Sequence, residues 1–241
     1  MEEAINEERG RRLFVMGDIH GAYQAMLECF RKAAFDYQHD MLICLGDVSD
    51  GWPEVNRVFD ELLKIKNLVY IMGNHDEWTL KWFETGNMPY VWLTQGGDAT
   101  ITSYPEEIPA SHVNLLRSAK EYFIHENKLF VHGGIYTDVP IEKQQRETLL
   151  WNRTLVQSAI YYSSCGFMHN LSSFDEIFVG HSPTLNFNST EPIHACEVWL
   201  MDTGAGWKGG CLSMMDIKTH RIYKSRPVQE YYPGVQGRDK F

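Results

Sequence analysis

The first third of the chain alternates short apolar runs with segments whose apolar residues recur at helical spacing. The apolar runs occupy 12–16, 41–45 and 68–72, and each is followed directly by a glycine. The helical segments occupy 23–35, 53–65 and 77–84. Runs of this length are typical of buried strands, and the periodicity between them is typical of amphipathic helices. This order predicts right-handed crossovers and a parallel sheet.

The second part of the chain has a different pattern. Residues 87–109 are rich in Gly, Thr and Pro and predict loops, whereas 111–122 predicts a helix. Strands are expected at 128–131, 176–179, 198–201 and 211–217, with partial helix in 142–170. The glycine cluster at 204–210 is typical of hairpin-like connections, so this half should be partly antiparallel. We interpret 1–241 as a single domain whose core spans about 12–217, with 1–10 and 222–241 peripheral.

Charge and composition narrow the classes of partner. The formal net charge of the 241 residues is -10 and no basic stripe is visible, which argues against a nucleic-acid partner held through its phosphates. An anionic substrate must then be attracted locally rather than by the overall field. The five cysteines form no C-x-x-C pair, which favours a reducing cytoplasm over a disulfide framework. No apolar stretch approaches ~20 residues, so we expect no membrane partner.

Side chains that can bind metal ions stand at the ends of apolar runs. They are Asp18 and His20, Asp47, Asn74, His132 and His181. Taken singly, each could be a helix cap, a turn residue or a strand-end histidine. Because the carboxyl ends of parallel strands meet at one edge of a sheet, we expect Asp18, Asp47 and Asn74 to converge. Such nitrogen and oxygen donors can hold two divalent ions, a recurring arrangement for hydrolysing phosphate esters.

The order and spacing of these residues resemble the calcineurin-like metallophosphoesterases, and within them the phosphoprotein phosphatases of the bacteriophage lambda type. The similarity extends over about 12–217 and includes the segments 149–153, 178–183 and 201–205. The resemblance implies a mixed α/β (α+β) fold, a four-layer α/β/β/α sandwich of two mixed β-sheets. It also implies a di-metal site at the carboxyl ends of the strands.

The resemblance further implies which residues bind each ion. The first ion would be bound by Asp18, His20 and Asp47, and the second by Asp47, Asn74, His132 and His181. Asp47 would therefore bridge the two ions. The mixture of imidazole, carboxylate and amide donors suits Mn²⁺, Fe or Zn²⁺ without choosing among them. Two ions that share a water lower its pKa, so that hydroxide is available near neutral pH to attack the phosphorus.

Other site residues are implied by the same resemblance. His75 matches the general acid that protonates the leaving oxygen, and Asp50 matches the carboxylate that orients it. Arg153 matches a phosphate-binding arginine, whose planar guanidinium can hold two oxygens where lysine could not. Asn74 would contact the substrate phosphate as well as the second ion.

The segment from Gly46 to Trp52 departs from the family pattern. Gly51 stands where the family usually has an arginine, so one of two phosphate-binding arginines is missing from this position. Its loss should weaken phosphate binding by about 1.5–3 kcal/mol, the contribution of a charged hydrogen bond. Trp52 could form a wall of the pocket, or it could be a helix-start aromatic that packs on the sheet. Asp76 stands where glutamate is usual.

These features predict a di-metal phosphoesterase that acts on phosphomonoesters, with phosphoserine or phosphothreonine proteins as the leading substrates by resemblance. A hydrolase of dinucleoside polyphosphates or of another small phosphorylated metabolite is the nearest alternative, since it shares the ligand set. A catalytically silent metal-binding scaffold is a third alternative. It predicts damage to the ligands or to His75, and the sequence contains neither. The pattern makes no prediction of oligomeric state.

Overall fold

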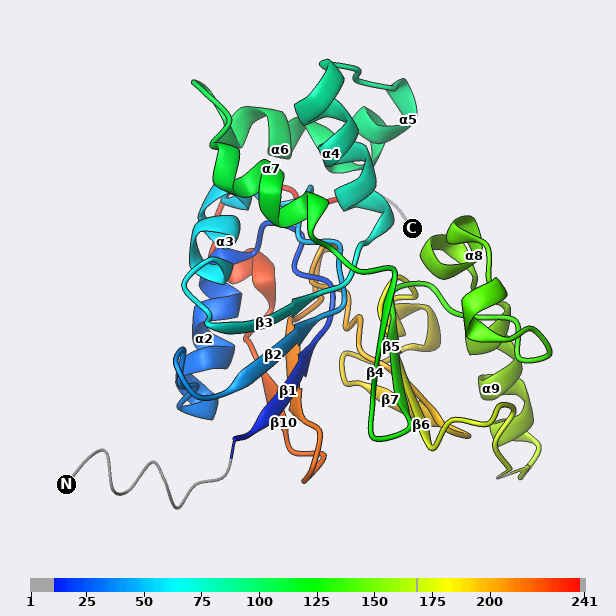
Figure 1. Ribbon diagram of the computed structural model, residues 1–241. Coiled ribbons are helices and arrows are strands. Elements are labelled where there is room, and N and C mark those ends of the chain that lie inside the picture. Colours follow the sequence, from blue (N-terminus) through cyan, green and yellow to red (C-terminus); the bar gives the residue numbers. More distant parts are fainter. Residues whose placement is uncertain (1–10, 168, 239–241) are drawn as a thin grey trace.

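Two mixed β-sheets form the centre of the computed structural model, which describes residues 11–167 and 169–238 (Figure 1). The first is five-stranded, in the order β10-β9-β1-β2-β3. Its strands are β1 (Leu13–Met16), β2 (Met41–Cys44), β3 (Asn67–Tyr70), β9 (Ser213–Asp216) and β10 (Ile222–Lys224). The strands β1, β2 and β3 are parallel, as the sequence predicts, and β9 and β10 are antiparallel additions. The carboxyl ends of the parallel strands therefore face the same way.

The second sheet is also five-stranded, in the order β4-β5-β6-β8-β7. Its strands are β4 (Tyr122–His125), β5 (Lys128–Val131), β6 (Glu176–Val179), β7 (Ile193–Ala195) and β8 (Val198–Leu200). The central strands β5, β6 and β8 are parallel, and the edge strands β4 and β7 are antiparallel to their neighbours. Both sheets are thus mixed, which confirms the predicted fold class.

Helices cover the outer faces of the two sheets (Figure 1). The helices α2 (Tyr23–Ala33) and α3 (Val55–Leu62) pack on the first sheet, and α8 (Arg146–Trp151) and α9 (Thr154–Ser164) pack on the second. Each outer interface has its own cluster of buried apolar side chains, as expected for helices with one apolar face. Within the described ranges no helix has the length and apolar composition needed to cross a bilayer.

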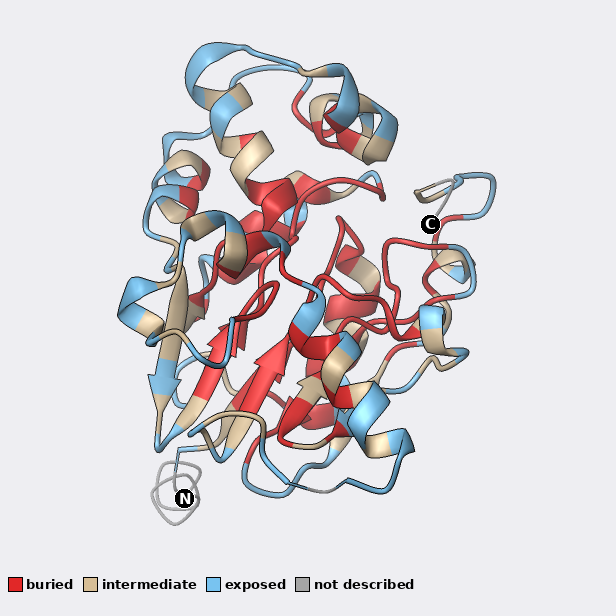
Figure 2. Ribbon diagram, turned by 90° about the vertical axis from the view of Figure 1, so that its right-hand side faces the viewer, coloured by how far each residue is buried: buried red, intermediate tan, exposed pale blue. Residues whose placement is uncertain are grey.

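The inner faces of the two sheets meet in a third apolar cluster, which includes Val15, Ile43, Phe130, Phe178 and Met215. Phe130 and Phe178 stack with their ring centroids 5.0 Å apart and their planes 8° from parallel. Figure 2 shows that burial continues from the strands into the loops that follow them. Polar side chains placed in those loops are therefore removed from bulk water.

We expect Phe178→Ala to lower the free energy of unfolding by about 3–5 kcal/mol, because it opens a cavity between two sheets that cannot collapse fully. Urea unfolding of the metal-free protein measures this change. Phe167, whose side chain is 54% exposed, provides the matched control, and Phe167→Ala should change stability by less than about 0.5 kcal/mol. Equal losses for the two variants would contradict the packing assigned to Phe178.

The segment 87–109 differs from the prediction of loops, because it forms short helical turns. They are α5 (Tyr90–Trp92), η1 (Leu93–Gly97) and α6 (Asp98–Ser103), and they lie with α4 (Asn74–Thr85) and α7 (Ala110–Arg117) above the first sheet (Figure 1). Gln95 and Gly96 leave the helical conformation, with φ −113° and φ 98°. This break keeps each piece too short for a periodic apolar pattern, which explains why the sequence predicted loops.

The remaining differences lie at element ends and in the C-terminal part. Helix α7 ends at Arg117, and residue 122 begins β4 instead of ending a helix. Helix α4 begins at Asn74, three residues earlier than predicted. The segment from 222 onward, expected to be peripheral, adds β10 to the first sheet and continues through η4 (Val228–Glu230). Short turns η2 (Ile141–Lys143) and η3 (Thr184–Phe187) complete the order of elements.

Candidate active site

The predicted metal-binding side chains all lie in buried turns at the carboxyl ends of strands or at the start of α4. Their backbone bends sharply, since φ is 50° at His20, 46° at Asp47 and 60° at His181. Residues other than glycine rarely adopt this left-handed conformation, which costs about 1–3 kcal/mol each and clusters at functional sites. The turns therefore hold these side chains toward a common point at the expense of stability.

Glycines beside the ligands allow the turns to approach one another. A Cβ on Gly73 would lie 2.2 Å from Oδ1 of Asp47, and a Cβ on Gly180 would lie 2.2 Å from Oδ1 of Asp18. Neither distance is possible for a real side chain, so both positions require glycine. The same carboxylates accept backbone hydrogen bonds, from N of His75 at 2.9 Å to Asp47 and from N of His181 at 3.0 Å to Asp18.

Backbone carbonyls fix the imidazole rings of His20 and His132 so that Nε2 faces the carboxylate of Asp47. Nδ1 of His20 lies 2.9 Å from the carbonyl oxygen of Ser49, and Nδ1 of His132 lies 2.8 Å from that of Leu45. Because a carbonyl oxygen only accepts, Nδ1 carries a proton in both rings, which leaves Nε2 of His20 with its lone pair. Burial lowers the pKa of His132 but the charge of Asp47 raises it to about 9, so its Nε2 would lose a proton on binding an ion. In His181, Nε2 is buried and has no hydrogen-bond partner among the described residues. A buried imidazole nitrogen without a partner is what a metal ligand requires.

Two groups of three side chains bring their ligand atoms within 4.8 Å of one another. One group is Asp18, His20 and Asp47, and the other is Asp47, His132 and His181. Oδ1 of Asn74 lies 2.9 Å from Nε2 of His132, beside the second group. Burial is the main cause that lowers the pKa of His20 and of His181 well below the usual value, so both rings are neutral donors. The residues present thus fit divalent metal ions, with Asp47 common to both groups.

His75 and Asp50 form a buried pair at the edge of this cluster. Nδ1 of His75 lies 2.5 Å from Oδ2 of Asp50. The Asp50 carboxylate also accepts two hydrogen bonds, from Trp92 Nε1 to Oδ2 at 2.8 Å and from Thr100 Oγ1 to Oδ1 at 2.6 Å. Burial raises the pKa of Asp50 to about 8, opposed by the hydrogen bonds from Thr100 and Trp92. Burial, followed by the charge of Arg238, lowers the pKa of His75 to about 3. The pair thus shares a proton away from water.

The helical turns at 90–103 support this pair, a role that the sequence did not reveal. Trp92 in α5 and Thr100 in α6 donate to Asp50, and both are fully buried. Asp76 supports the adjacent turn from the first turn of α4. Its Oδ1 accepts hydrogen bonds from the backbone N of Val48 at 3.0 Å and of Ser49 at 3.2 Å. A shorter side chain than glutamate therefore fits the distance between α4 and the turn that contains Asp47.

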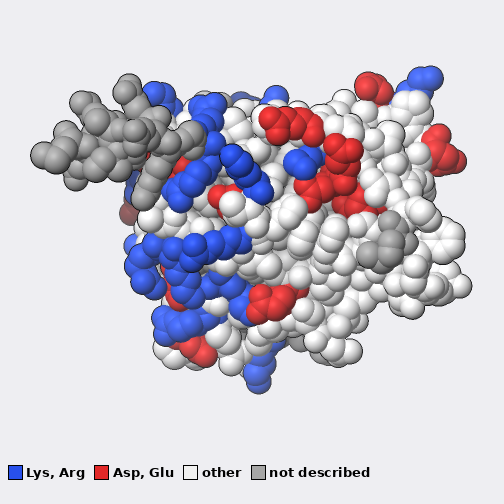
Figure 3. Space-filling view, turned by 90° about the horizontal axis from the view of Figure 1, so that it is seen from below, with Lys and Arg blue, Asp and Glu red and all other residues white. Residues whose placement is uncertain are grey.

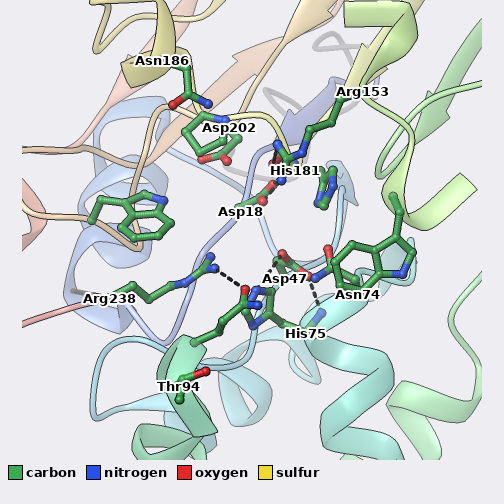
Figure 4. A pocket seen from close by; sticks show the side chains of 14 residues that line it. Asp18, Asp47, Asn74, His75, Thr94, Arg153, His181, Asn186, Asp202 and Arg238 are labelled. Carbon is green, nitrogen blue, oxygen red and sulfur yellow. Dashed lines mark hydrogen bonds and ion pairs between the residues drawn. The ribbon is translucent and has the colours of Figure 1, made fainter. Parts of the chain in front are cut away.

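A cavity of about 450 Å³ opens above the cluster (Figure 4). Arg153, which lies at the start of α9, donates from Nη1 to the carbonyl oxygen of His181 at 2.7 Å and to Oγ of Ser182 at 3.2 Å. Arg153 and Arg238 are the cationic side chains among the described residues that line this cavity. Trp151 and Trp207 line it as well, and both present aromatic surface.

Positive charge also gathers on another face of the molecule. Figure 3 views the molecule from below, at the opposite end from the cavity, and Lys and Arg gather there beneath the first sheet. The linear sequence shows no basic stripe, so this gathering results from folding. Attraction of an anion to the cavity therefore depends on the arginines that line it and on any bound ions.

The structure brings together the residues that the sequence singled out, and it adds others. Asp202, Gln95, Trp207 and Arg238 also line the cavity without having been predicted. Trp52 packs inside, as the second interpretation held, because it is fully buried and donates from Nε1 to the carbonyl oxygen of Ala205 at 2.6 Å. Asp202 directly follows the predicted strand 198–201, so its position at a strand end could have signalled it. Gln95, Trp207 and Arg238 lie in glycine-rich or irregular segments, which carry no periodic signal.

Known proteins share this architecture. Serine/threonine-protein phosphatase 1 of Salmonella typhimurium (strain LT2) is 24% identical over 221 residues, covering 90% of this chain and 96% of that protein. An asymmetrical bis(5′-nucleosyl)-tetraphosphatase of Bacillus cereus (strain Q1) is 25% identical over 146 residues, covering 52% of this chain and 58% of that protein. A crystal structure described provisionally as a diadenosine tetraphosphatase superposes with a TM-score of 0.68 at 15% identity, covering 90% of this chain and 94% of that one.

The match to a protein family extends over both sheets. Residues 11–217 match the calcineurin-like phosphoesterases, and this range contains β1 to β9 together with the turns that hold the candidate metal-binding side chains. The two mixed sheets and the buried ligand groups agree with that match. The chain therefore belongs to the calcineurin-like phosphoesterase family, whose named relatives here are phosphatases and other phosphoester or phosphoanhydride hydrolases.

Proposed function

We propose that this protein uses two divalent ions to hydrolyse phosphomonoesters, with phosphoserine and phosphothreonine peptides as the leading substrates. The observation that carries the proposal is the position of Asp47. Its carboxylate belongs to both groups of metal-binding side chains, and its Oδ2 lies 3.9 Å from Nε2 of His75. A proton donor thus stands beside the place where ions and a phosphate would meet.

The proposed ligand assignment follows these groups. Asp18, His20 and Asp47 would hold the first ion, and Asp47, Asn74, His132 and His181 the second. Two divalent ions bound there would lower the pKa of a water between them and neutralise charge on phosphate oxygens. Mn²⁺, Fe and Zn²⁺ all suit these donors.

The protein's own side chains would bind the phosphate and move a proton. Arg153, anchored on the carbonyl oxygen of His181, would hold phosphate oxygens with its planar guanidinium, and Asn74 lines the same cavity. His75 would donate the proton on Nε2 to the leaving oxygen, while the proton that it shares with Asp50 moves to Nδ1, so that the ring ends neutral. Burial of the pair keeps competing water from this proton.

A second substrate class is supported by the aromatic surface of the cavity. Trp151, which is 40% exposed, and Trp207 both line it, and such rings can stack on nucleobases. Dinucleoside polyphosphates are therefore the alternative substrates. The relative named as a serine/threonine phosphatase is covered over 96% of its length, against 58% for the tetraphosphatase, and this supports phosphoproteins as the first choice.

A substrate panel tests the proposal. The chain is loaded with Mn²⁺ and assayed with p-nitrophenyl phosphate, phosphoserine and phosphothreonine peptides, and diadenosine tetraphosphate. We expect hydrolysis of p-nitrophenyl phosphate and a higher kcat/KM for the phosphopeptides than for the dinucleotide. A higher kcat/KM for diadenosine tetraphosphate than for the phosphopeptides would instead support dinucleoside polyphosphates as the substrates. Retention of metal without turnover of any of these compounds would contradict the proposed reaction and support a metal-binding scaffold.

The proposed function also implies partners and a location. Phosphorylated proteins or small phosphorylated molecules are the proposed partners. We keep a reducing cytoplasm as the proposed location, because the five cysteines carry no disulfide and Cys29 and Cys44 are buried. Burial also raises the pKa of the Cys29 thiol to about 12, so that this thiol has little nucleophilic character.

A further inference from the structure

The C-terminal segment brings a second guanidinium into the cavity. Figure 4 shows Arg238 and Arg153 approaching from opposite sides, with the carboxylates of Asp18 and Asp47 between them. The two arginines are separated by most of the second sheet in the sequence, so their meeting depends on how the end of the chain is held. Both arginines line the same cavity.

Trp52 holds the end of the chain in place. Its ring stacks on Tyr232, with centroids 5.2 Å apart and planes 21° from parallel. A Cβ on Gly237 would lie only 2.7 Å from Cζ2 of the Trp52 ring, so the backbone there lies against this ring. The backbone N of Arg238 then donates to the carbonyl oxygen of Gly206 at 2.8 Å. Packing and a backbone hydrogen bond thus fix the direction in which Arg238 leaves the segment.

Arg238 lies next to Gly51. Cγ of Arg238 lies 3.5 Å from the point where a Cβ of Gly51 would stand. Gly51 itself has φ +85°, which side-chain-bearing residues rarely adopt. The distance of 3.5 Å corresponds to an ordinary van der Waals contact, so the two positions are neighbours in the fold. The position that lacks an arginine in the sequence is therefore next to an arginine in the fold.

The guanidinium of Arg238 contacts three side chains, and one of its N–H donors has no partner among the described residues. Nη2 donates to Oε1 of Gln95 at 3.1 Å, and Nη1 lies 3.1 Å from Nε2 of His20. The ring of Trp207 lies 4.4 Å from Cζ, a cation–π contact. Nε is buried and has no hydrogen-bond partner in the described part of the chain. Because the Nε2 lone pair of His20 can serve only one partner, a bound ion would also release Nη1.

We propose that Arg238 is a second phosphate-binding residue, which holds the substrate phosphate together with Arg153 from the opposite side of the cavity. The inference rests on the proposed function, since it assigns a further residue to the same site. A planar guanidinium with an unused Nε–H and a releasable Nη1 matches the geometry of phosphate oxygens.

The test compares Arg238→Ala, Arg238→Lys and the unchanged chain, each loaded with Mn²⁺. Calorimetric titration with inorganic phosphate should show affinity about 10- to 100-fold weaker for Arg238→Ala, the effect of one or two charged hydrogen bonds. KM for p-nitrophenyl phosphate should rise by a similar factor while kcat changes little, because the contact is present before and during the reaction. Arg238→Lys should fall between the two, since lysine keeps the charge without the planar fork.

Manganese affinity separates phosphate binding from a positioning role. Arg238→Ala should bind Mn²⁺ at least as tightly as the unchanged chain, because the variant removes a cation that contacts His20. Lys208, an exposed cation two residues after Gly206, gives the matched control, and Lys208→Ala should leave phosphate affinity unchanged.

The contradictory outcomes are specific. Unchanged phosphate affinity in Arg238→Ala would overturn the inference. So would a loss of Mn²⁺ and of kcat with normal phosphate affinity, which would make Arg238 a support for His20. If the unchanged chain neither binds phosphate nor hydrolyses any phosphoester, the proposed function fails first, and the two failures are thereby distinguished.

Discussion

Asp47→Asn is expected to reduce hydrolysis of p-nitrophenyl phosphate by more than about 100-fold, since even outer-sphere changes at metal sites cost 10–100-fold. Asp47 is the carboxylate shared by both groups of ligands, and its Oδ2 lies 3.4 Å from Nε2 of His132 and 3.9 Å from that of His20. Asparagine has nearly the same size but carries no charge, so it cannot bind two cations as strongly. Metal analysis after dialysis should show that the variant binds both ions more weakly than the unchanged chain does.

Asp202 provides the matched control for this experiment. Its carboxylate is buried and lines the same cavity, yet it belongs to neither group of ligands. Oδ1 accepts a hydrogen bond from the backbone N of Gly204 at 2.9 Å. We expect Asp202→Asn to retain bound metal and most of its turnover. Near wild-type turnover with full metal occupancy in Asp47→Asn would show that the assignment of Asp47 is wrong, as would identical losses in both variants.

His75→Asn is expected to lower turnover of phosphoserine peptides by about 10²–10⁴-fold, the usual contribution of a general acid. The loss should be much smaller for p-nitrophenyl phosphate, because nitrophenolate leaves readily without a proton. Nδ1 of His75 is held by Asp50 at 2.5 Å, so Nε2 is the atom that can face a leaving oxygen. Metal content should remain unchanged, because His75 belongs to neither group of ligands. Steady-state kinetics with the two substrates measures the difference.

A second buried histidine provides the control. His112 is paired with Asp60, whose Oδ1 lies 3.0 Å from Nε2, and Nδ1 lies 2.9 Å from the hydroxyl of Tyr104. His112 does not line the cavity. His112→Asn should therefore leave turnover of the two substrates unchanged or lower it by the same factor for both. An equal loss for both substrates in His75→Asn would contradict its role as the acid and leave it a structural residue.

The first sheet and the ligands at its edge could be predicted from sequence because the signals there are local. Each parallel strand is a short apolar run that ends in glycine, and the following residue or the next few carry the metal-binding side chain. The topology of parallel strands then requires Asp18, Asp47 and Asn74 to meet. The glycines were part of that signal, since the turns approach closely at Gly73.

The contacts that hold Asp50 and the proposed acid His75 could not be predicted, because they depend on tertiary contacts of a segment without periodicity. Trp92 is fully buried although its helix has only the length of Tyr90–Trp92. Gly97 makes this packing possible, since a Cβ there would lie 2.6 Å from the Trp92 ring. A pair of glycines in an irregular segment normally indicates a turn, and here it accommodates an indole.

The hairpin β4–β5 and the position of Arg238 were missed for different reasons. Glu126 and Asn127 form the hairpin turn with φ 47° and 57°, a conformation that Asn-Gly or Gly-Gly usually signals. The sequence Glu-Asn gives no such signal, so β4 was not predicted and only its first residue, Tyr122, was assigned to the end of a helix. Arg238 reaches His20 across 218 residues of sequence, and no local pattern can predict a contact at that distance.

The most direct test of the central claim is a titration of the metal-free chain with Mn²⁺, with bound metal and hydrolysis of p-nitrophenyl phosphate measured in the same samples. The two ligand groups that share Asp47 predict about two ions per chain, with hydrolysis appearing as the second is bound. Full hydrolysis by a chain that contains no metal would contradict the account. So would maximal hydrolysis by a chain that binds only one Mn²⁺ ion.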